Sequence, residues 1–375
     1  MIIGIDGNEA NVEKKVGVSV YTANLLHYFQ KRANSDLQFR IYLREPPHYS
    51  SSFGLALPEE SSHFTYRVVK GPAMWSQLFL PADLYLKRGI NVFFSPAHYA
   101  PRYCPVPVVT TIHDVAYFYY PQEFIQKDLY QLKNWTGYSI AHSKKIITVS
   151  KTTKKDVMKF YNVPDGKIEV VYNGFEKTEP HLVGRFAETA KRYDIQKYTY
   201  LLYVSTLQPR KDVPTLIEAF SQLRASHPQY KLVIVGRKGW MYDEIFTRVQ
   251  EQNLDKSVVF TGYLPDDEVV ALYQNAFCFV LPSLYEGFGI TILEAMSHGC
   301  PVITTYASSL PEVGGEACLY FEPKSPQDLL FNIDLLIKDA DLRKNLIEKG
   351  RERTKQFSWK KCANETLQVL TSTAL

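Results

Sequence analysis

The chain has 375 residues, 45% of them hydrophobic and 22% charged, and a formal net charge of only +4. This length allows two domains with substantial cores, and the small charge gives no indication of nucleic acid as a partner. The five cysteines are scattered and include no CxxC pair. That usage predicts reduced thiols in a cytoplasmic protein rather than disulfides or structural zinc.

Targeting and membrane-spanning signals are absent from the sequence. The N-terminus, MIIGIDGNEAN, has neither a basic region nor an apolar stretch of signal-peptide type. No run approaches 18 apolar residues, the length that a membrane-spanning helix needs. We therefore expect a soluble protein that at most touches a membrane surface.

Short apolar runs of strand type recur through the first half and alternate with helical or irregular segments. The first run is followed by a loop that contains Gly17 and by a helical pattern over residues 20–32. The predicted strands are residues 1–6, 39–43, 91–96, 106–114, 145–150 and 168–174.

The same alternation restarts after a polar stretch near residues 176–198. A strand over residues 198–205 is followed by a helix over 213–223. Further strands are predicted at residues 231–236, 258–262, 277–283 and 301–305. Strands alternating with helices predict the α/β class, here two doubly wound parallel sheets in domains 1–176 and 190–357 that face a cleft. Because the helix over 358–375 follows the second sheet, we expect it to pack back on the first domain.

Two glutamates stand eight positions apart in the segment SLYEGFGITILEAM, residues 283–296. Glu286 lies in a glycine-rich loop after a strand, and Glu294 lies in the next helix, for which Gly299 is the expected C-terminal cap. A helix N-terminus at the carboxyl end of a strand suits a phosphate group. A phosphate would repel carboxylates, so we expect both glutamates to bind hydroxyls, as a sugar and a ribose provide. The alternative is that Glu286 begins a solvated loop and Glu294 lies on a helix surface without a binding role.

In this architecture the chain resembles the retaining glycosyltransferases of family 4, which have the GT-B fold. The segment EGFGITILEAM matches that family's pair of glutamates separated by seven residues. Six further segments match in the family's order: residues 111–114, 148–157, 170–176, 205–212, 261–269 and 308–317. In detail the chain is similar to bacterial mannosyltransferases of that family.

The resemblance implies a site for a nucleotide-sugar donor in the second domain. Lys211 would contact the diphosphate with Arg210 beside it, although Ser205-Thr206 stands where many members have a glycine and an arginine. Glu294 would hold the ribose hydroxyls and Glu286 those of the transferred sugar. The remaining donor contacts implied are the backbone N–H groups of Phe288, Gly289 and Ile290, and the base-contacting residues Tyr263 and Leu264. For these two, ordinary packing at a strand end is the alternative.

In the first domain, the resemblance places His113 beside the reacting carbon of the donor. Asp114 is expected to orient the loop, and Gly17 marks where backbone can approach the diphosphate or the acceptor. A lone histidine is more often structural, with hydrogen bonds to neighbouring backbone, than catalytic. Gly17 is as readily an ordinary turn glycine.

The implied reaction is transfer of a sugar, with GDP-mannose as the leading donor and UDP-glucose and UDP-N-acetylglucosamine as alternatives. No motif supplies a carboxylate nucleophile near His113, which favours attack on the face that the diphosphate leaves over a covalent intermediate. No metal or other cofactor is expected, because lysine and helix N–H groups supply positive charge. Asp266-Asp267, which resembles a metal-binding pair, is interpreted as a helix cap.

Other functions use similar folds. A nicotinamide-dependent dehydrogenase is disfavoured because no GxGxxG follows a strand. A phosphorylase, an epimerase and a non-catalytic sugar-binding protein remain alternatives.

A basic stripe suggests where the acceptor is found. Lys151, Lys155 and Lys159 recur every four residues in KTTKKDVMKFY, with Lys154 alongside. A basic amphipathic helix can lie on an anionic membrane, and some family members reach lipid-linked acceptors through this region. The alternative is a solvated helix face, with a soluble glycan as acceptor.

Overall fold

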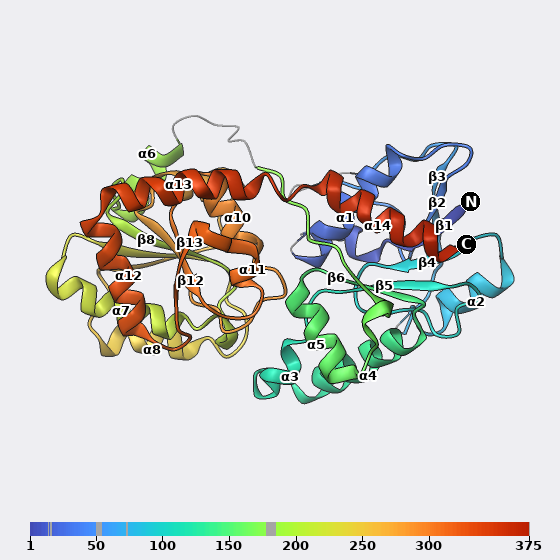
Figure 1. Ribbon diagram of the computed structural model, residues 1–375, viewed down its shortest axis with the longest axis horizontal. Helices are drawn as coiled ribbons and strands as arrows, with labels where there is room; N and C mark the ends of the chain where they lie inside the picture. Colours follow the sequence, from blue (N-terminus) through green and yellow to red (C-terminus); the bar gives the residue numbers. More distant parts are fainter. Residues whose placement is uncertain (14, 16, 50–54, 73, 178–184, 375) are drawn as a thin grey trace. The chain divides into compact units, whose positions relative to one another are not determined.

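The structure is a computed structural model that describes residues 1–13, 15, 17–49, 55–72, 74–177 and 185–374 (Figure 1). It divides into two compact units. The first unit comprises Met1–Gly174 and Phe357–Leu375, and the second comprises Phe175–Gln356. Each unit contains its own parallel sheet with helices, which confirms the predicted pair of doubly wound α/β domains.

The first unit contains a seven-stranded sheet in the order β3-β2-β1-β4-β5-β6-β7. Every neighbouring pair is parallel. Strand order reverses at β1, which lies between β2 and β4, so the loops after β1 and β4 open at the carboxyl edge of the sheet. The strands are β1 Ile2–Asp6, β2 Gln38–Leu43, β3 Phe64–Val68, β4 Val92–Ser95, β5 Val108–Ile112, β6 Lys145–Thr148 and β7 Ile168–Val170.

The C-terminal helix completes the first unit, as predicted. The α-helices of this unit are α1 Val18–Gln30, α2 Phe79–Leu86, α3 Ala116–Tyr119, α4 Gln126–His142, α5 Lys151–Tyr161 and α14 Trp359–Ala374. Trp359 and Leu370 of α14 share a buried cluster with Ile3 of β1 and Phe94 of β4. A Cβ at Gly174 would overlap Trp359, so only glycine allows this close approach.

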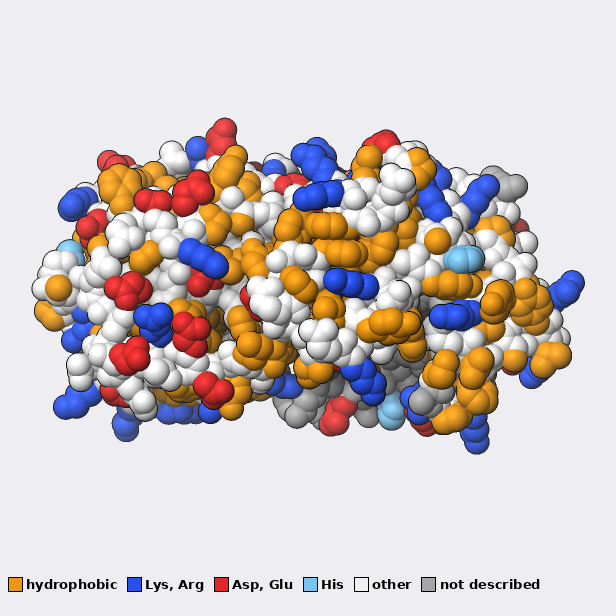
Figure 2. All heavy atoms as spheres, turned by 90° about the horizontal axis from the view of Figure 1, so that it is seen from below, with side chains coloured by type: hydrophobic (Ala, Val, Ile, Leu, Met, Phe, Trp, Pro, Cys, Tyr) orange, Lys and Arg blue, Asp and Glu red, His pale blue; other side chains and the backbone are white. Residues whose placement is uncertain are grey.

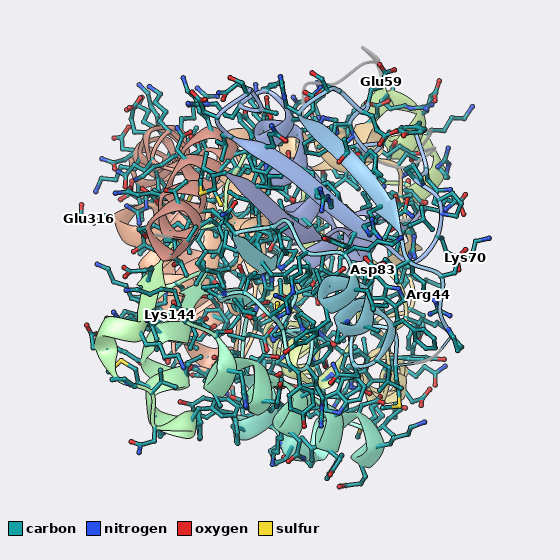
Figure 3. The ribbon with its side chains drawn as sticks, turned by 90° about the vertical axis from the view of Figure 1, so that its right-hand side faces the viewer. Arg44, Glu59, Lys70, Asp83, Lys144 and Glu316 are labelled. Carbon is teal, nitrogen blue, oxygen red and sulfur yellow. The ribbon has the colours of Figure 1, made fainter. Side chains whose placement is uncertain are left out.

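One edge of the first sheet is joined to a helix by an ion pair. Arg67 of β3 donates hydrogen bonds to both carboxylate oxygens of Asp83 in α2, one of them at 2.7 Å. Figure 3 labels Asp83 on this helix. A bidentate arginine–carboxylate pair fixes geometry as well as charge, so it fixes the position of α2 relative to the edge strand.

The second unit contains a six-stranded sheet in the order β10-β9-β8-β11-β12-β13, again with every neighbouring pair parallel. Its strands are β8 Tyr200–Val204, β9 Lys231–Val235, β10 Val258–Gly262, β11 Cys278–Leu281, β12 Val302–Thr305 and β13 Cys318–Phe321. Its helices are α6 Arg185–Tyr193, α7 Val213–Ser226, α8 Asp243–Glu251, α9 Asp266–Asn275, α10 Ile290–Ser297, α11 Leu310–Gly314, α12 Pro326–Lys338 and α13 Ala340–Thr354.

The order of the second sheet reverses at β8, which lies between β9 and β11. The loops after β8 and β11 therefore diverge at the carboxyl edge, where α/β sheets bind their ligands. None of the five cysteines forms a disulfide. Within the described ranges, no helix combines the length and the apolar character needed to cross a bilayer.

Candidate active site

The strand order of the second unit brings the predicted charged residues together. Arg210 and Lys211 form a short 3-10 turn, Pro209–Lys211, after β8, and Glu286 lies in the loop after β11. The Lys211 ammonium forms an ion pair with Oε1 of Glu286, and Arg210 Nη1 lies 3.5 Å from Oε2. Only 10% of the Lys211 side chain and 12% of the Glu286 side chain are exposed. The pair is therefore largely shielded from water.

This environment keeps Glu286 ionised. Burial of the carboxyl works to raise its pKa, but the charges of Lys211 and Arg210 together lower it below the ordinary value. Hydrogen bonds from Lys211 and from Ser283 Oγ, at 2.7 Å, act in the same direction. Glu286 is therefore a negatively charged carboxylate at neutral pH that can accept hydrogen bonds.

The backbone of the two loops is also joined. The guanidinium of Arg210 donates to the carbonyl of Tyr285, and the Arg210 carbonyl accepts from the Leu284 N–H at 2.9 Å. A buried guanidinium that bonds a carbonyl and a carboxylate holds a fixed orientation. Arg210 therefore links the β8 loop to the β11 loop in addition to placing a positive charge there.

The N-terminus of α10 lies in the same loop, directly after Phe288. Gly289 is its N-cap with φ 89°, and Ile290 is its first residue. A Cβ at Gly289 would come within 2.7 Å of Leu310 Cδ2, so both the backbone conformation and the space require glycine. The backbone of Phe288, Gly289 and Ile290 thus lies at the positive end of the α10 dipole, close in the chain to Glu286. This helix end suits an anion.

The helix ends as the sequence predicted. Gly299 has φ 73° and follows the C-cap His298. The N–H of Gly299 bonds to Met296 O and the N–H of Cys300 to Ala295 O, each at 3.0 Å. This pair of hydrogen bonds is a Schellman motif, in which glycine takes the left-handed position.

Glu294 has the opposite electrostatic environment to Glu286. It projects from α10, is partly buried, and accepts a hydrogen bond from the Tyr273 hydroxyl at 3.3 Å. Burial raises its pKa to about 7, with a smaller contribution from the charge of Asp266, and the Tyr273 bond only partly offsets this. The carboxyl is therefore close to half-protonated at neutral pH.

The interpretation of Asp266-Asp267 as a helix cap needs correction. Helix α9 begins at Asp266 itself, and its N-cap is Pro265, which makes no side-chain capping bond. Both aspartates instead lie in the first turn, where negative charge interacts favourably with the helix dipole. The N-cap position is occupied by Pro265, because Asp266 is already the first helical residue.

The two residues predicted to contact the base differ in exposure. Tyr263 follows Gly262 at the end of the edge strand β10, and 44% of it is exposed. The guanidinium of Arg237 lies over its ring, 4.5 Å from the centroid. Leu264 is buried, with 5% exposed.

In the first unit, His113 directly follows β5 and is buried. Its Nε2 lies 2.8 Å from the carbonyl of Pro96, and its ring meets that of Tyr21 edge-on at 4.8 Å. Because a carbonyl only accepts, Nε2 is the protonated nitrogen and Nδ1 is the acceptor. Burial lowers the pKa of His113 to about 3, helped by His98 nearby. The imidazole is therefore neutral.

The other two predicted residues of the first unit have local backbone roles. Asp114 Oδ1 accepts from the Ala116 N–H at 3.1 Å, at the start of α3. Gly17 is the N-cap of α1 with φ 51° and ψ −110°, a conformation that favours glycine, and no described side chain or backbone atom comes within 4 Å of the position of a Cβ.

Sequence reasoning assigned no role to His98, Ser308 or Ser309. His98 follows β4 with φ 57°, and its ring centroid lies 5.6 Å from that of His113. Its buried Nδ1 makes no hydrogen bond to any residue that the structure describes. All three residues follow predicted strands at the carboxyl edge of a sheet, and Ser308 and Ser309 also begin the family-matching segment 308–317, but neither signal indicated a role for their side chains.

The basic stripe exists on α5. Lys151, Lys155 and Lys159 are exposed, whereas Lys154 is partly buried and bonds to Asp165 and the Ile168 carbonyl, each at 2.9 Å. Lys154 is therefore part of the unit's own structure rather than of the stripe.

Comparison with known proteins establishes the class. Residues 16–179 match the family described as Glycosyltransferase Family 4, and residues 186–353 match the family described as Glycosyl transferases group 1. The chain belongs to the glycosyltransferases of family 4 and is a hexosyltransferase. Its fold is GT-B, as the resemblance implied.

The individual relatives include enzymes of O-antigen assembly. The O-antigen chain mannosyltransferase B of Escherichia coli is 30% identical over 287 residues, which are 74% of this chain and 73% of that protein. The O-antigen chain mannosyltransferase RfbU of Salmonella typhimurium is 33% identical over 230 residues, 60% of each protein. The solved structure of Anabaena Alr3699/HepE in complex with UDP and glucose superposes with a TM-score of 0.74 over 99% of both chains, at 18% identity.

Proposed function

We propose that this enzyme is a retaining mannosyltransferase that takes mannose from GDP-mannose. The observation that carries a donor site is the buried Glu286–Lys211–Arg210 group beside the N-terminus of α10. Support for mannose comes from the O-antigen mannosyltransferases among its relatives. UDP-glucose is the alternative donor, because HepE was solved with UDP-glucose; UDP-N-acetylglucosamine remains a third.

Each charged group of the second unit has a separate role in this proposal. Lys211, with Arg210, stabilises the departing diphosphate, since an ammonium has three donors and can bond a carboxylate and a phosphate together. The ionised Glu286 accepts hydrogen bonds from the transferred sugar. Glu294 accepts from the ribose, and the backbone of Phe288, Gly289 and Ile290 contacts sugar and phosphate.

The base would stack on or pack against the end of β10. Tyr263 offers an exposed ring there, and the backbone of Leu264 offers hydrogen-bonding groups. These residues would contribute affinity for the nucleoside and little to the chemical step.

The same-face mechanism fits a neutral His113. The bond between the anomeric carbon and the diphosphate oxygen breaks first, and the acceptor oxygen forms its bond on that face. The departing diphosphate oxygen takes the acceptor's proton. A histidine with a pKa of about 3 is a poor proton acceptor at neutral pH, so we assign His113 to contact with the sugar near the reacting carbon. Asp114 and Gly17 set the backbone conformation of the first-unit loops that would approach the acceptor.

We also propose that the reaction needs no metal ion. The two cations and the α10 N-terminus supply the charge that a metal would provide at the diphosphate. The nucleotide sugar is a substrate, so the enzyme would carry no resident cofactor.

The acceptor is proposed to be a hydroxyl of a glycan or of a lipid-linked sugar, in the cytoplasm. The first unit exposes hydrophobic residues, among them Ile125 and Tyr130 at the start of α4, in addition to the α5 lysines. Figure 2 shows basic and hydrophobic side chains next to one another on the face seen from below. That combination favours peripheral contact with an anionic membrane over a purely solvated face.

The two glutamates provide the test of this proposal. Thermal stabilisation by GDP-mannose, UDP-glucose and UDP-N-acetylglucosamine identifies the donor, since ligand at ~100 times its dissociation constant adds about 2.7 kcal/mol. Glu294→Ala should weaken binding of the free nucleoside diphosphate. Glu286→Ala should leave that binding intact and impair transfer. If both variants bind nucleoside diphosphate as the wild type does, the Glu294 assignment is wrong; if no donor stabilises the wild type, the donor site is wrong.

A further inference from the structure

Two consecutive serines after β12 hold the backbone of Glu286 on both sides. Ser308 Oγ accepts from the Glu286 N–H at 2.8 Å, and Ser309 Oγ donates to the Glu286 carbonyl at 2.8 Å. Both backbone groups of this residue are thus bonded to side chains of a neighbouring loop. Because these bonds fix the peptides before and after Glu286, they restrict the direction in which its side chain leaves the chain.

The same segment contacts the β11 loop at two further points. Thr305 Oγ1 donates to the Ser283 carbonyl at 2.5 Å, and Ser283 in turn donates to the Glu286 carboxylate. Leu310 lies against Gly289, the N-cap of α10. Residues 305–310, called here the serine buttress, therefore support both the carboxylate and the helix N-terminus of the site.

The backbone at Ser308 is unfavourable for a serine. Its φ is 47°, in the left-handed region that costs a residue with a Cβ energy and that glycine adopts readily. Glycine would be the more stable choice for the backbone alone. The hydroxyl that serine adds bonds the Glu286 N–H, so the observed strain coincides with a contact to the site.

We infer that Ser308 is a positioning residue of the glycosyl transfer, which orients Glu286 toward the donor sugar through its backbone; this rests on the proposed role of Glu286. Ser308 itself touches no substrate. Its loss misplaces the carboxylate, and displacement of a positioning group by about 1 Å can cost on the order of 100-fold in rate.

The informative substitution is Ser308→Gly, because it removes the hydroxyl and relieves the left-handed strain together. The expected result is an unfolding temperature equal to or above that of the wild type, with donor turnover reduced about 10- to 100-fold. Ser308→Ala should lose turnover equally while unfolding at a lower temperature than Ser308→Gly. If Ser308→Gly and Ser308→Ala lose the same turnover although they differ in stability, the loss is due to the missing hydroxyl. Asn253→Gly is the matched control, because Asn253 also has a left-handed backbone and lies exposed after α8, and this variant should keep full turnover.

Two measurements separate positioning from a general structural role. Binding of GDP or UDP, which lack the transferred sugar, should be unchanged in Ser308→Gly. In a Glu286→Ala background, Ser308→Gly should cause no further loss, because it acts through Glu286. Wild-type turnover in Ser308→Gly, or a full additional loss in the Glu286→Ala background, overturns the inference.

A readout that does not depend on activity distinguishes this inference from the proposed function. The Glu286 amide should be protected from hydrogen exchange in the wild type and exchange at least tenfold faster in Ser308→Gly. If the wild type releases nucleoside diphosphate from none of GDP-mannose, UDP-glucose and UDP-N-acetylglucosamine, the proposed function fails. If exchange at Glu286 is the same in both proteins, the serine buttress does not hold Glu286 and the inference fails whatever the enzyme transfers.

Discussion

Affinity for the donor should depend on pH through Glu294. Burial raises the pKa of this carboxyl to about 7, and the proposed ribose contact needs its ionised form. If only the ionised form binds, the apparent dissociation constant is inversely proportional to the fraction of enzyme that is ionised. With a pKa of about 7, that fraction falls from about 90% at pH 8 to about 10% at pH 6, so affinity should fall about tenfold, or about 1.4 kcal/mol.

Calorimetric titration with a nucleotide sugar is the appropriate assay, because its diphosphate is esterified at both ends and does not titrate in this range. Glu294→Gln keeps the size and removes the charge. Its affinity should be independent of pH and equal to that of the wild type at low pH. Asp212→Asn is the matched control, since burial raises the pKa of Asp212 beside Lys211 to about 6; it should retain the midpoint near pH 7.

Neither Glu286 nor His113 can produce this profile. The pKa of Glu286 is held below its ordinary value and that of His113 falls to about 3, so neither titrates between pH 6 and 8. The stability of the fold should show the reverse trend. The folded state binds the Glu294 proton more tightly than the unfolded chain does, so this stabilisation is present below pH 4.5 and is lost as the pH rises to about 7. Affinity that is constant from pH 6 to 8, or unchanged pH dependence in Glu294→Gln, would refute the reasoning.

Three further outcomes are expected. Lys211→Met should lower turnover by about 10²–10³ because it removes positioned charge at the diphosphate, and near-full activity would contradict this role. Turnover should survive EDTA; a complete loss that magnesium or manganese restores would exclude a metal-independent reaction. The protein should float with anionic liposomes at low salt and not at high salt, and a Lys151/Lys155/Lys159→Glu variant should stay soluble. If the wild type also stays soluble at low salt, the acceptor is to be sought among soluble sugars.

Most of the fold could be predicted because buried parallel strands appear in the sequence as short apolar runs. Every predicted strand occurs, including residues 277–283, where β11 is buried throughout. Two edge strands were missed. β3, with the sequence FTYRV, has a single buried residue and lacks the continuous apolar pattern, and the two central residues of β13 are only half-buried. Edge strands pack on fewer neighbours, so their sequences are less constrained to be apolar.

The sequence singled out Lys211 and Glu286, but it could not show the contact between them. Lys211 and Glu286 are 75 positions apart, and their ion pair depends on β8 and β11 being neighbours in the sheet. No local pattern encodes that order. The serine buttress was missed for a related reason: a left-handed position usually indicates glycine, and a serine there becomes informative only when its partner is known.

The two glutamates show how far tertiary environment controls what one residue type can do. Both belong to one segment, yet Glu286 faces two cations from the β8 loop, whereas Glu294 faces the Tyr273 hydroxyl and the Asp266 charge from α9. Their pKa values consequently shift in opposite directions, and such a divergence commonly separates two roles in one site. A carboxylate that never takes a proton suits a group that must hold the sugar as positive charge develops on it. A carboxyl that ionises near neutrality costs less to leave unbound when the donor is absent, which suits the ribose contact proposed for Glu294.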